Sequence, residues 1–170
     1  MTVFQAIRKR YSCRAYKDKT IESDTLDRIL EAARLAPSAK NLQDWRFVVV
    51  TESEKRARLA EAANNQKFLA QAGAIIIGCS NSNETMRCGQ PVAPINVAIA
   101  MEHIALQAVE EGLASCWIGS FYPEKVRAIL GIPEDIQIVE LMALGYPADS
   151  PREANRVPMD KIVCREQWRF

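Results

Sequence analysis

Helices are predicted where apolar residues recur at helical spacing next to residue types that begin or end helices. The first helix is expected after Thr2, a typical capping residue, with Val3, Phe4 and Ile7 on one face. A second helix is expected to begin at Ser23 or Asp24 and to end before Pro37, because the residue before a proline avoids the helical region. Two further helices are expected, one after the cap Ser53 (running to about Ala63) and one that begins at Pro123 (running to Leu130).

Four short runs of apolar and β-branched residues predict buried strands. They are Phe47–Val50, Ala74–Ile77, Ser115–Ile118 and Ile136–Leu144. Strands separated by helices predict a layered α/β or α+β fold. No linker, repeat or low-complexity tract interrupts the chain, so we expect one domain over residues 1–170. Beyond Ala148 the chain is polar and rich in proline, and we expect residues 148–170 to form an arm that lies on another surface.

The longest helical pattern, Pro94–Glu111, is apolar on almost every side. A helix of this kind has to be enclosed on all sides. In a chain of 170 residues we therefore expect a second subunit to cover one side of this helix. The alternative is a central core helix in a monomer.

Composition and charge exclude several classes of protein. The formal net charge is +1, unlike the strong basic excess of nucleic-acid-binding proteins. The N-terminus becomes charged at Arg8 and lacks the apolar core of a signal peptide. No apolar stretch reaches the roughly 18 residues of a membrane-spanning helix. We expect a cytoplasmic protein that binds neither nucleic acid nor membranes.

The chain has five cysteines, an odd number, and none forms a C-x-x-C pair. This pattern is typical of free thiols in a reducing compartment. A zinc site is not expected, because only Cys79 and Cys88 are close in sequence and the single histidine, His103, lies in the long helical pattern. We expect the His103 ring to be satisfied in the core or at an interface rather than to act in catalysis.

Common catalytic motifs are absent, but one segment is suited to binding an anion. The chain has no G-x-G-x-x-G after a strand, no P-loop and no G-x-S-x-G. In an extended segment, however, Arg10, Ser12 and Arg14 point to the same side. Arginine binds phosphate through paired, charge-assisted hydrogen bonds. The three residues are therefore candidates for one phosphate site, the alternative being an ordinary solvated face.

Three segments resemble the FMN-dependent nitroreductase family. A-I-R-K-R-Y-S-C-R-A-Y (6–16) resembles its opening R-x-S-x-R segment, and A-P-S-A-K-N-L-Q-D-W-R-F (36–47) is similar to A-P-S-x-x-N-x-Q-P-W-x-F. G-L-A-S-C-W-I-G-S-F (112–121) resembles G-L-G-x-C-W-I-G-x-F. The segments occur in the family order, and with the arm the resemblance spans the chain. It implies an α+β fold: a three-layer sandwich around a central, mostly antiparallel sheet, in an interlocked homodimer.

The resemblance also implies how the first segment binds FMN. Arg10 and Ser12 would hold the phosphate, and Arg14 would lie near flavin N1/O2 or the ribityl chain. A cation there stabilises the negative charge of the reduced flavin. A surface salt bridge is the alternative for Arg14. Tyr11 stands where a second basic residue is more usual. The C-terminal basic residue that completes the phosphate site would be Arg156, with Arg152 and Lys161 as further candidates.

Other parts of the flavin site are implied in the same way. Two departures stand out in the second segment: Lys40 replaces a small residue and Asp44 replaces proline. One of the amides Asn65 and Gln66 would bind the flavin O2/N3 edge, unless both belong to an ordinary polar loop. The resemblance implies three further contacts. The partner subunit would lay a segment with Pro37, Ser38, Ala39 and Asn41 against the flavin. Trp117 and Ile118 would support the back face of the ring, and the backbone N–H groups of Gly119 and Ser120 would face flavin N5 and O4.

The resemblance implies an oxidoreductase that transfers electrons from NADH or NADPH through FMN to electron-poor acceptors such as nitroaromatics and quinones. The order would be ping-pong, and no protein side chain would be catalytic, since flavin N5 does the chemistry. Alternatives are a specialised flavin enzyme of the same fold (an enoate reductase or a dehalogenase) and a non-enzymatic flavin carrier or redox sensor. A third is a metal- or thiol-based redox protein that uses Cys79 and Cys88.

Overall fold

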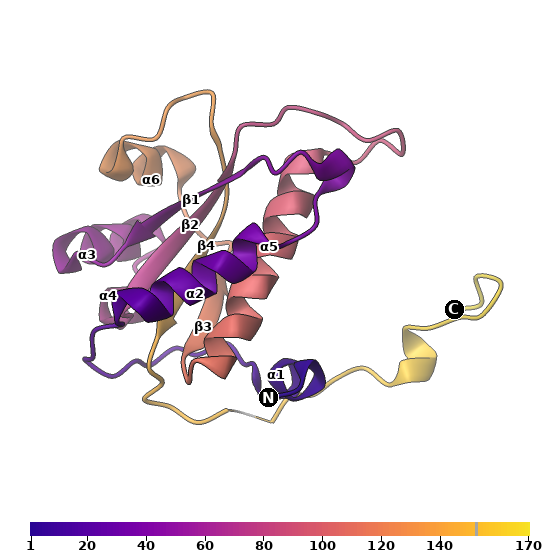
Figure 1. Cartoon of the computed structure of the whole chain (residues 1–170), viewed down its shortest axis with the longest axis horizontal. Coiled ribbons are helices and arrows are strands. Elements are labelled where there is room, and N and C mark those ends of the chain that lie inside the picture. Colours follow the sequence, from indigo (N-terminus) through magenta and orange to yellow (C-terminus); the bar gives the residue numbers. More distant parts are fainter. Residues whose placement is uncertain (152) are drawn as a thin grey trace.

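The computed structural model describes residues 1–151 and 153–170, and its centre is a four-stranded antiparallel sheet (Figure 1). The strands are β1 (Trp45–Val50), β2 (Ala74–Ser80), β3 (Ala114–Ile118) and β4 (Gln137–Gly145). Their order is β1-β2-β4-β3, and each neighbouring pair is antiparallel. The four predicted strands and the antiparallel sheet are therefore confirmed, although β1 begins two residues earlier than expected.

Helices cover both faces of this sheet and make three layers. One face carries α3 (Ser53–Ala62), α4 (Phe68–Gln71) and α6 (Pro123–Leu130). The other carries α2 (Ser23–Arg34) and α5 (Val92–Glu110), which lie side by side (Figure 1). This arrangement confirms the three-layer α+β sandwich.

The central strand β2 packs into both cores. Ile75, Ile77 and Cys79 belong to the cluster under α3 and α6, whereas Ala74 and Ile76 belong to the cluster under α2 and α5. All five side chains are almost inaccessible to solvent. Burial on both faces explains why this strand is a continuous apolar run instead of an alternating one.

The helix ends confirm some boundary predictions and correct others. Thr2 caps α1 (Val3–Lys9) in a capping box: its hydroxyl accepts from Gln5 N–H at 3.2 Å, and its own N–H donates to Gln5 Oε1 at 2.8 Å. The prediction that Ser53 caps α3 was wrong by one residue, because Glu52 occupies the cap. The helix α5 begins at Val92, two residues before the expected start. The four-residue α4 was missed, since one turn has no visible periodicity.

The apolar helix α5 is buried on the sheet side and half-buried on the other. Ile95 is 38% exposed, and Ile99, Leu106 and Val109 are only partly covered. By length and composition α5 could cross a membrane, but half of that window is buried against the sheet, α1 and α2. Its apolar character is therefore accounted for in part by the core and in part by this half-buried outer face.

The chain after β4 leaves the body of the molecule and runs out as an arm (Figure 1). Its only helical element among the described residues is the short 3-10 helix η2 (Met159–Lys161). The arm exposes six large apolar side chains: Val157, Met159, Ile162, Val163, Trp168 and Phe170. Exposed apolar groups on this scale mark a surface that contacts something else.

Candidate functional site

The segment that follows α1 is held between the start of β3 and the chain after β4. The N–H of Cys13 donates to Ser115 O at 3.0 Å, and Ser12 bridges the same residue in parallel. On the other side Tyr16 pairs with Pro147, and Ala148 N–H donates to Ala15 O at 2.9 Å. The start of the chain and the start of the arm are thereby brought together.

A cavity of about 310 Å³ lies at this junction. It contains five of the predicted site residues, namely Arg10, Tyr11, Ser12, Arg14 and Arg156. With Arg8 and Lys9 the lining has five basic side chains, against one carboxylate, Asp149. This excess of positive charge suits an anion such as phosphate. Of the two further candidates, Arg152 lies outside the described residues, and Lys161 lies away from the cavity in η2.

The two arginines of the first segment keep hydrogen-bonding capacity free. The Nε of Arg10 is buried and has no hydrogen-bond partner among the described residues, although it lies 3.3 Å from Glu102 Oε1. Arg14 Nη1 donates to Ser12 O at 3.3 Å, and no ion pair links Arg14 to a carboxylate in the described part of the chain. A buried guanidinium nitrogen that has an ion-pair neighbour but no hydrogen bond, in a basic cavity, fits an anionic ligand.

Asp149 is a residue of this site that the sequence did not reveal. Its carboxylate accepts from Tyr11 Oη at 3.0 Å, from Cys13 Sγ at 3.1 Å and from Arg14 N–H at 3.3 Å. Burial, followed by the hydrogen bond to Asp149, raises the pKa of Tyr11, so the phenol stays protonated and donates. Asp149 therefore ties the start of the arm to the anion cavity. It lies in a polar stretch with no motif, so no sequence signal marked it.

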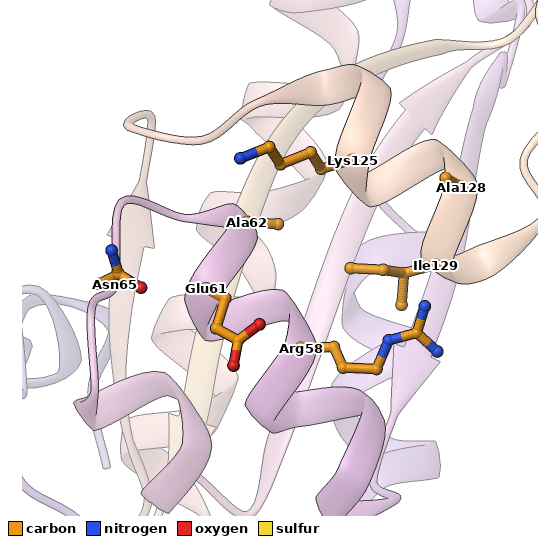
Figure 2. Close-up of a pocket in the computed structure, with 7 residues that line it drawn as sticks. All are labelled: Arg58, Glu61, Ala62, Asn65, Lys125, Ala128 and Ile129. Carbon is orange, nitrogen blue, oxygen red and sulfur yellow. The ribbon is translucent and has the colours of Figure 1, made fainter.

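A second group of predicted residues meets beyond the end of β3. Gln66 Nε2 donates to Ser120 O at 3.2 Å, and Asn64 Nδ2 donates to Ser120 Oγ. Asn65 instead lines a groove of about 550 Å³ between α3 and α6, across from Lys125 (Figure 2). Of the two candidate amides, Gln66 is thus the one joined to the Gly119–Ser120 segment.

Glu140, an acidic residue that the sequence analysis does not single out, lies beside Gly119. A Cβ at Gly119 would come within 3.5 Å of Glu140 Oε1 on the neighbouring strand β4. Burial raises the pKa of Glu140. Trp117 is half-buried on the α5 side of the sheet, whereas Ile118 is buried on the other side. An acidic residue inside an otherwise apolar strand was the signal that could have marked Glu140.

The predicted residues Pro37, Ser38, Ala39 and Asn41 do not reach the anion cavity of their own chain. They precede β1 and include the 3-10 turn η1 (Ala39–Asn41), which is held at the first turns of α5 by Ala39 N–H donating to Asn96 Oδ1 at 3.0 Å. The cavity lies instead beside α1, where Arg10 meets Glu102 further along α5. Lys40 makes an exposed ion pair with Glu84 at 3.3 Å.

The histidine and the cysteines do not form a reactive centre. The Nδ1–H of His103 donates to Ala32 O at 3.0 Å, which satisfies the ring as expected. All five cysteines are free, and no metal-binding cluster of three or more His, Cys, Asp or Glu occurs in the described residues. Burial raises the pKa of Cys13 and of Cys79 to about 11 and also raises that of Cys116. Buried, protonated thiols are poor nucleophiles.

The different exposure of these thiols predicts a simple labelling pattern. With a disulfide reagent at pH 8, Cys88 is expected to react within minutes, because it is exposed. Cys13, Cys79 and Cys116 are expected to react only after the protein is unfolded. Mass spectrometry of the labelled peptides would measure this order. Rapid labelling of Cys79 in the native protein would contradict the assignment and favour a thiol-based role.

The fold and the site define a class: an α+β sandwich with a basic anion cavity beside α1 and a glycine-containing turn after β3. The sequence model described as "Nitroreductase family" matches residues 7–73 and 60–146. A candidate NADH dehydrogenase/NAD(P)H nitroreductase of Archaeoglobus fulgidus is 34% identical over 94% of each chain. An NADH dehydrogenase of Thermus thermophilus is 32% identical over 95% of this chain and 93% of its own. The chain belongs to the nitroreductase family.

Solved structures agree with this assignment. A nitroreductase family protein of Clostridium difficile superimposes with a TM-score of 0.90 at 32% identity, over 99% of this chain and 100% of its own. An FMN-dependent nitroreductase from the same species gives a TM-score of 0.84 at 30% identity, over 97% and 99% of the two chains. The resemblance to the nitroreductase family and the three-layer α+β fold that it implied are confirmed.

Proposed function

We propose that this protein is an FMN-dependent oxidoreductase that transfers electrons from NADH or NADPH to small electron-poor acceptors such as nitroaromatics and quinones. The observation that carries the proposal is the convergence of Arg10, Ser12, Arg14 and Arg156 on one basic cavity. Relatives named as an FMN reductase and an NADPH-flavin oxidoreductase support the same chemistry. The five free thiols are consistent with a cytoplasmic location.

The residues present fit FMN. Arg10 and Ser12 offer donors to a phosphate, and Arg156 approaches from the arm. The chain has no dinucleotide fingerprint, which favours the mononucleotide FMN over FAD. When bound, FMN supplies the two-electron chemistry. Arg14 would stabilise negative charge at the pyrimidine end, and Gln66 would hold the Ser120 backbone that faces the ring.

The proposal includes a homodimer in which each site contains residues of both chains. Three surfaces support it: the half-buried outer face of α5, the exposed residues Val3, Phe4 and Ile7 of α1, and the apolar arm. The Pro37–Asn41 segment is also remote from the cavity of its own chain, so it is free to lie against the flavin of the other subunit. A symmetric dimer would then carry two identical sites.

The decisive experiment is the absorption spectrum of the purified protein, followed by acid release of its flavin and its identification. We expect FMN, bleached by NADH or NADPH under anaerobic conditions and reoxidised by a quinone. Parallel lines in double-reciprocal plots are expected for a ping-pong order. Release of FAD would contradict the phosphate assignment. Bound FMN that neither NADH nor NADPH reduces would instead indicate a flavin carrier or sensor.

Tyr11→Phe tests the role of the arm in this site. The variant keeps the ring but loses the hydrogen bond to Asp149, so the start of the arm is held less firmly. A single neutral or charged hydrogen bond contributes about 0.5–3 kcal/mol. We expect FMN binding to weaken by roughly 5-fold, at the low end of that range because Asp149 keeps its bond from Arg14 N–H. Fluorescence titration of flavin-free protein would measure it, with Tyr122→Phe as a matched control outside the cavity.

A further inference from the structure

A carboxylate is buried at the start of β1, where the second segment departs from the family pattern. Asp44 is 5% exposed, and no ion pair neutralises it among the residues that the structure describes. Its two oxygens accept from two buried side chains: Ser80 Oγ at 2.6 Å and Asn96 Nδ2 at 2.5 Å. Burying a charge is costly unless its hydrogen bonds are complete, so this cluster has one defined arrangement.

The Asp44 carboxylate and the Ala39 N–H together fix which way the Asn96 amide points. The Asn96 NH₂ group donates to Asp44 Oδ1, because a carboxylate oxygen accepts hydrogen bonds. The carbonyl oxygen of the same amide then points the other way and accepts from Ala39 N–H at 3.0 Å. Asp44 thus acts on the backbone of the Pro37–Asn41 segment through Asn96.

This segment needs such an anchor because its backbone is unusual. Lys40, Asn41 and Gln43 all have positive φ, at 52°, 56° and 50°. Residues other than glycine populate this region sparsely and stay there only where the surroundings fix them. Within the segment, Ser38 Oγ accepts from Gln43 N–H at 3.0 Å. Among the hydrogen bonds of the described residues, the one from Ala39 N–H to Asn96 Oδ1 fastens the segment to the buried core.

We propose that Asp44 is a positioning residue: through Asn96 it fixes the Pro37–Asn41 segment in the conformation that contacts FMN. The proposal rests on the proposed function for the identity of the ligand. Ser80 provides an internal contrast, because it bonds the same carboxylate but contacts Ser82 N–H at 3.0 Å instead of the segment. Loss of Ser80 therefore perturbs Asp44 without removing the link to Ala39.

The first test measures amide hydrogen exchange in the flavin-free full chain. Asp44→Ala and Asn96→Ala are expected to accelerate exchange in the peptide covering residues 37–43 at least tenfold relative to the buried β4 peptide. Ser80→Ala should leave this ratio within about twofold of the wild type. Asn96→Ala keeps the Asp44–Ser80 pair and provides the answer if Asp44→Ala does not fold. Equal acceleration in Asn96→Ala and Ser80→Ala, or none in either, would overturn the proposal.

The second test concerns the flavin. Asp44→Ala should raise the dissociation constant for FMN at least fivefold more than Ser80→Ala, and should alter the visible circular dichroism of bound FMN, which Ser80→Ala should leave unchanged. If exchange differs between these variants but affinity and dichroism do not, the link from Asp44 to FMN is refuted. A wild-type protein that binds no FMN would refute the proposed function, whereas the exchange data would still decide whether Asp44 holds the segment.

Discussion

Replacing Arg10 and Arg14 together with alanine is expected to weaken FMN binding by roughly 10²- to 10⁴-fold. A hydrogen bond to a charged group contributes about 1.5–3 kcal/mol, and two independent losses of that size would add up to about 3–6 kcal/mol. Both side chains line the basic cavity, and the Nε of Arg10, although 3.3 Å from Glu102 Oε1, makes no hydrogen bond to the residues that the structure describes. Arg10→Ala alone should cost about 1.5–3 kcal/mol.

The measurement is a fluorescence titration of flavin-free protein with FMN, beside a urea unfolding curve for each variant. Lys17→Ala is the matched control: it removes a cation from the same stretch of chain but lies outside the cavity. Stability should change little in all variants, because the contact between Arg10 and Glu102 is partly exposed. Wild-type affinity for FMN in the double variant would show that this cavity does not bind the FMN phosphate.

Deleting residues 157–170 is expected to raise the dissociation constant of the dimer at least about 1000-fold, equivalent to about 4 kcal/mol. The six exposed apolar side chains of the arm contribute nothing to the core of their own chain. Full burial of such a side chain is favourable by about 1.5–3 kcal/mol. Partial burial of six of them against a partner is therefore enough to account for the free energy of dimerisation that the deletion is expected to remove. The truncated chain should keep its fold and lose FMN as it dissociates.

Sedimentation at low micromolar concentration would measure the dimer, and circular dichroism would check the fold. The double variant Trp168→Ala/Phe170→Ala should show part of the effect, since these rings pack against each other at the end of the arm, 4.8 Å between centroids. Glu166→Ala/Gln167→Ala is the control from the same stretch. A truncated protein that stays dimeric at the same concentration, or a monomer with full NAD(P)H oxidation, would contradict the shared site.

Much of the fold could be predicted from the sequence because local patterns determine it. β2 is apolar because it is buried on both faces, and Thr2 begins α1 through a cap formed within four residues. The anion cavity could be predicted in part for a similar reason: residues 10, 12 and 14 alternate along one extended segment. Arg156 came only from the family resemblance, since nothing local connects it to Arg10.

The residues that were missed depend on contacts between distant segments. Asp149 acts on Tyr11, and Glu140 lies beside Gly119 only because β3 and β4 are adjacent in the sheet. Asp44 departs from the family pattern, but its bond to Asn96 joins residues that are far apart in the chain. The choice between Asn65 and Gln66 also required the turn after α3, which directs Gln66 to Ser120 and Asn65 to the groove between α3 and α6.

The anion cavity is lined by residues of the segment between Arg8 and Arg14 and, after the last strand, by Asp149, Ser150, Pro151, Ala154 and Arg156. During synthesis the first of these groups leaves the ribosome long before the second exists. The cavity can therefore form only after the chain has been translated as far as Arg156. A ligand held there cannot template the early folding of the sheet, and it stabilises only chains that extend at least to that residue. Chains that terminate before Asp149 would keep Arg8, Arg10 and Arg14 but have no closed cavity in which to retain the cofactor.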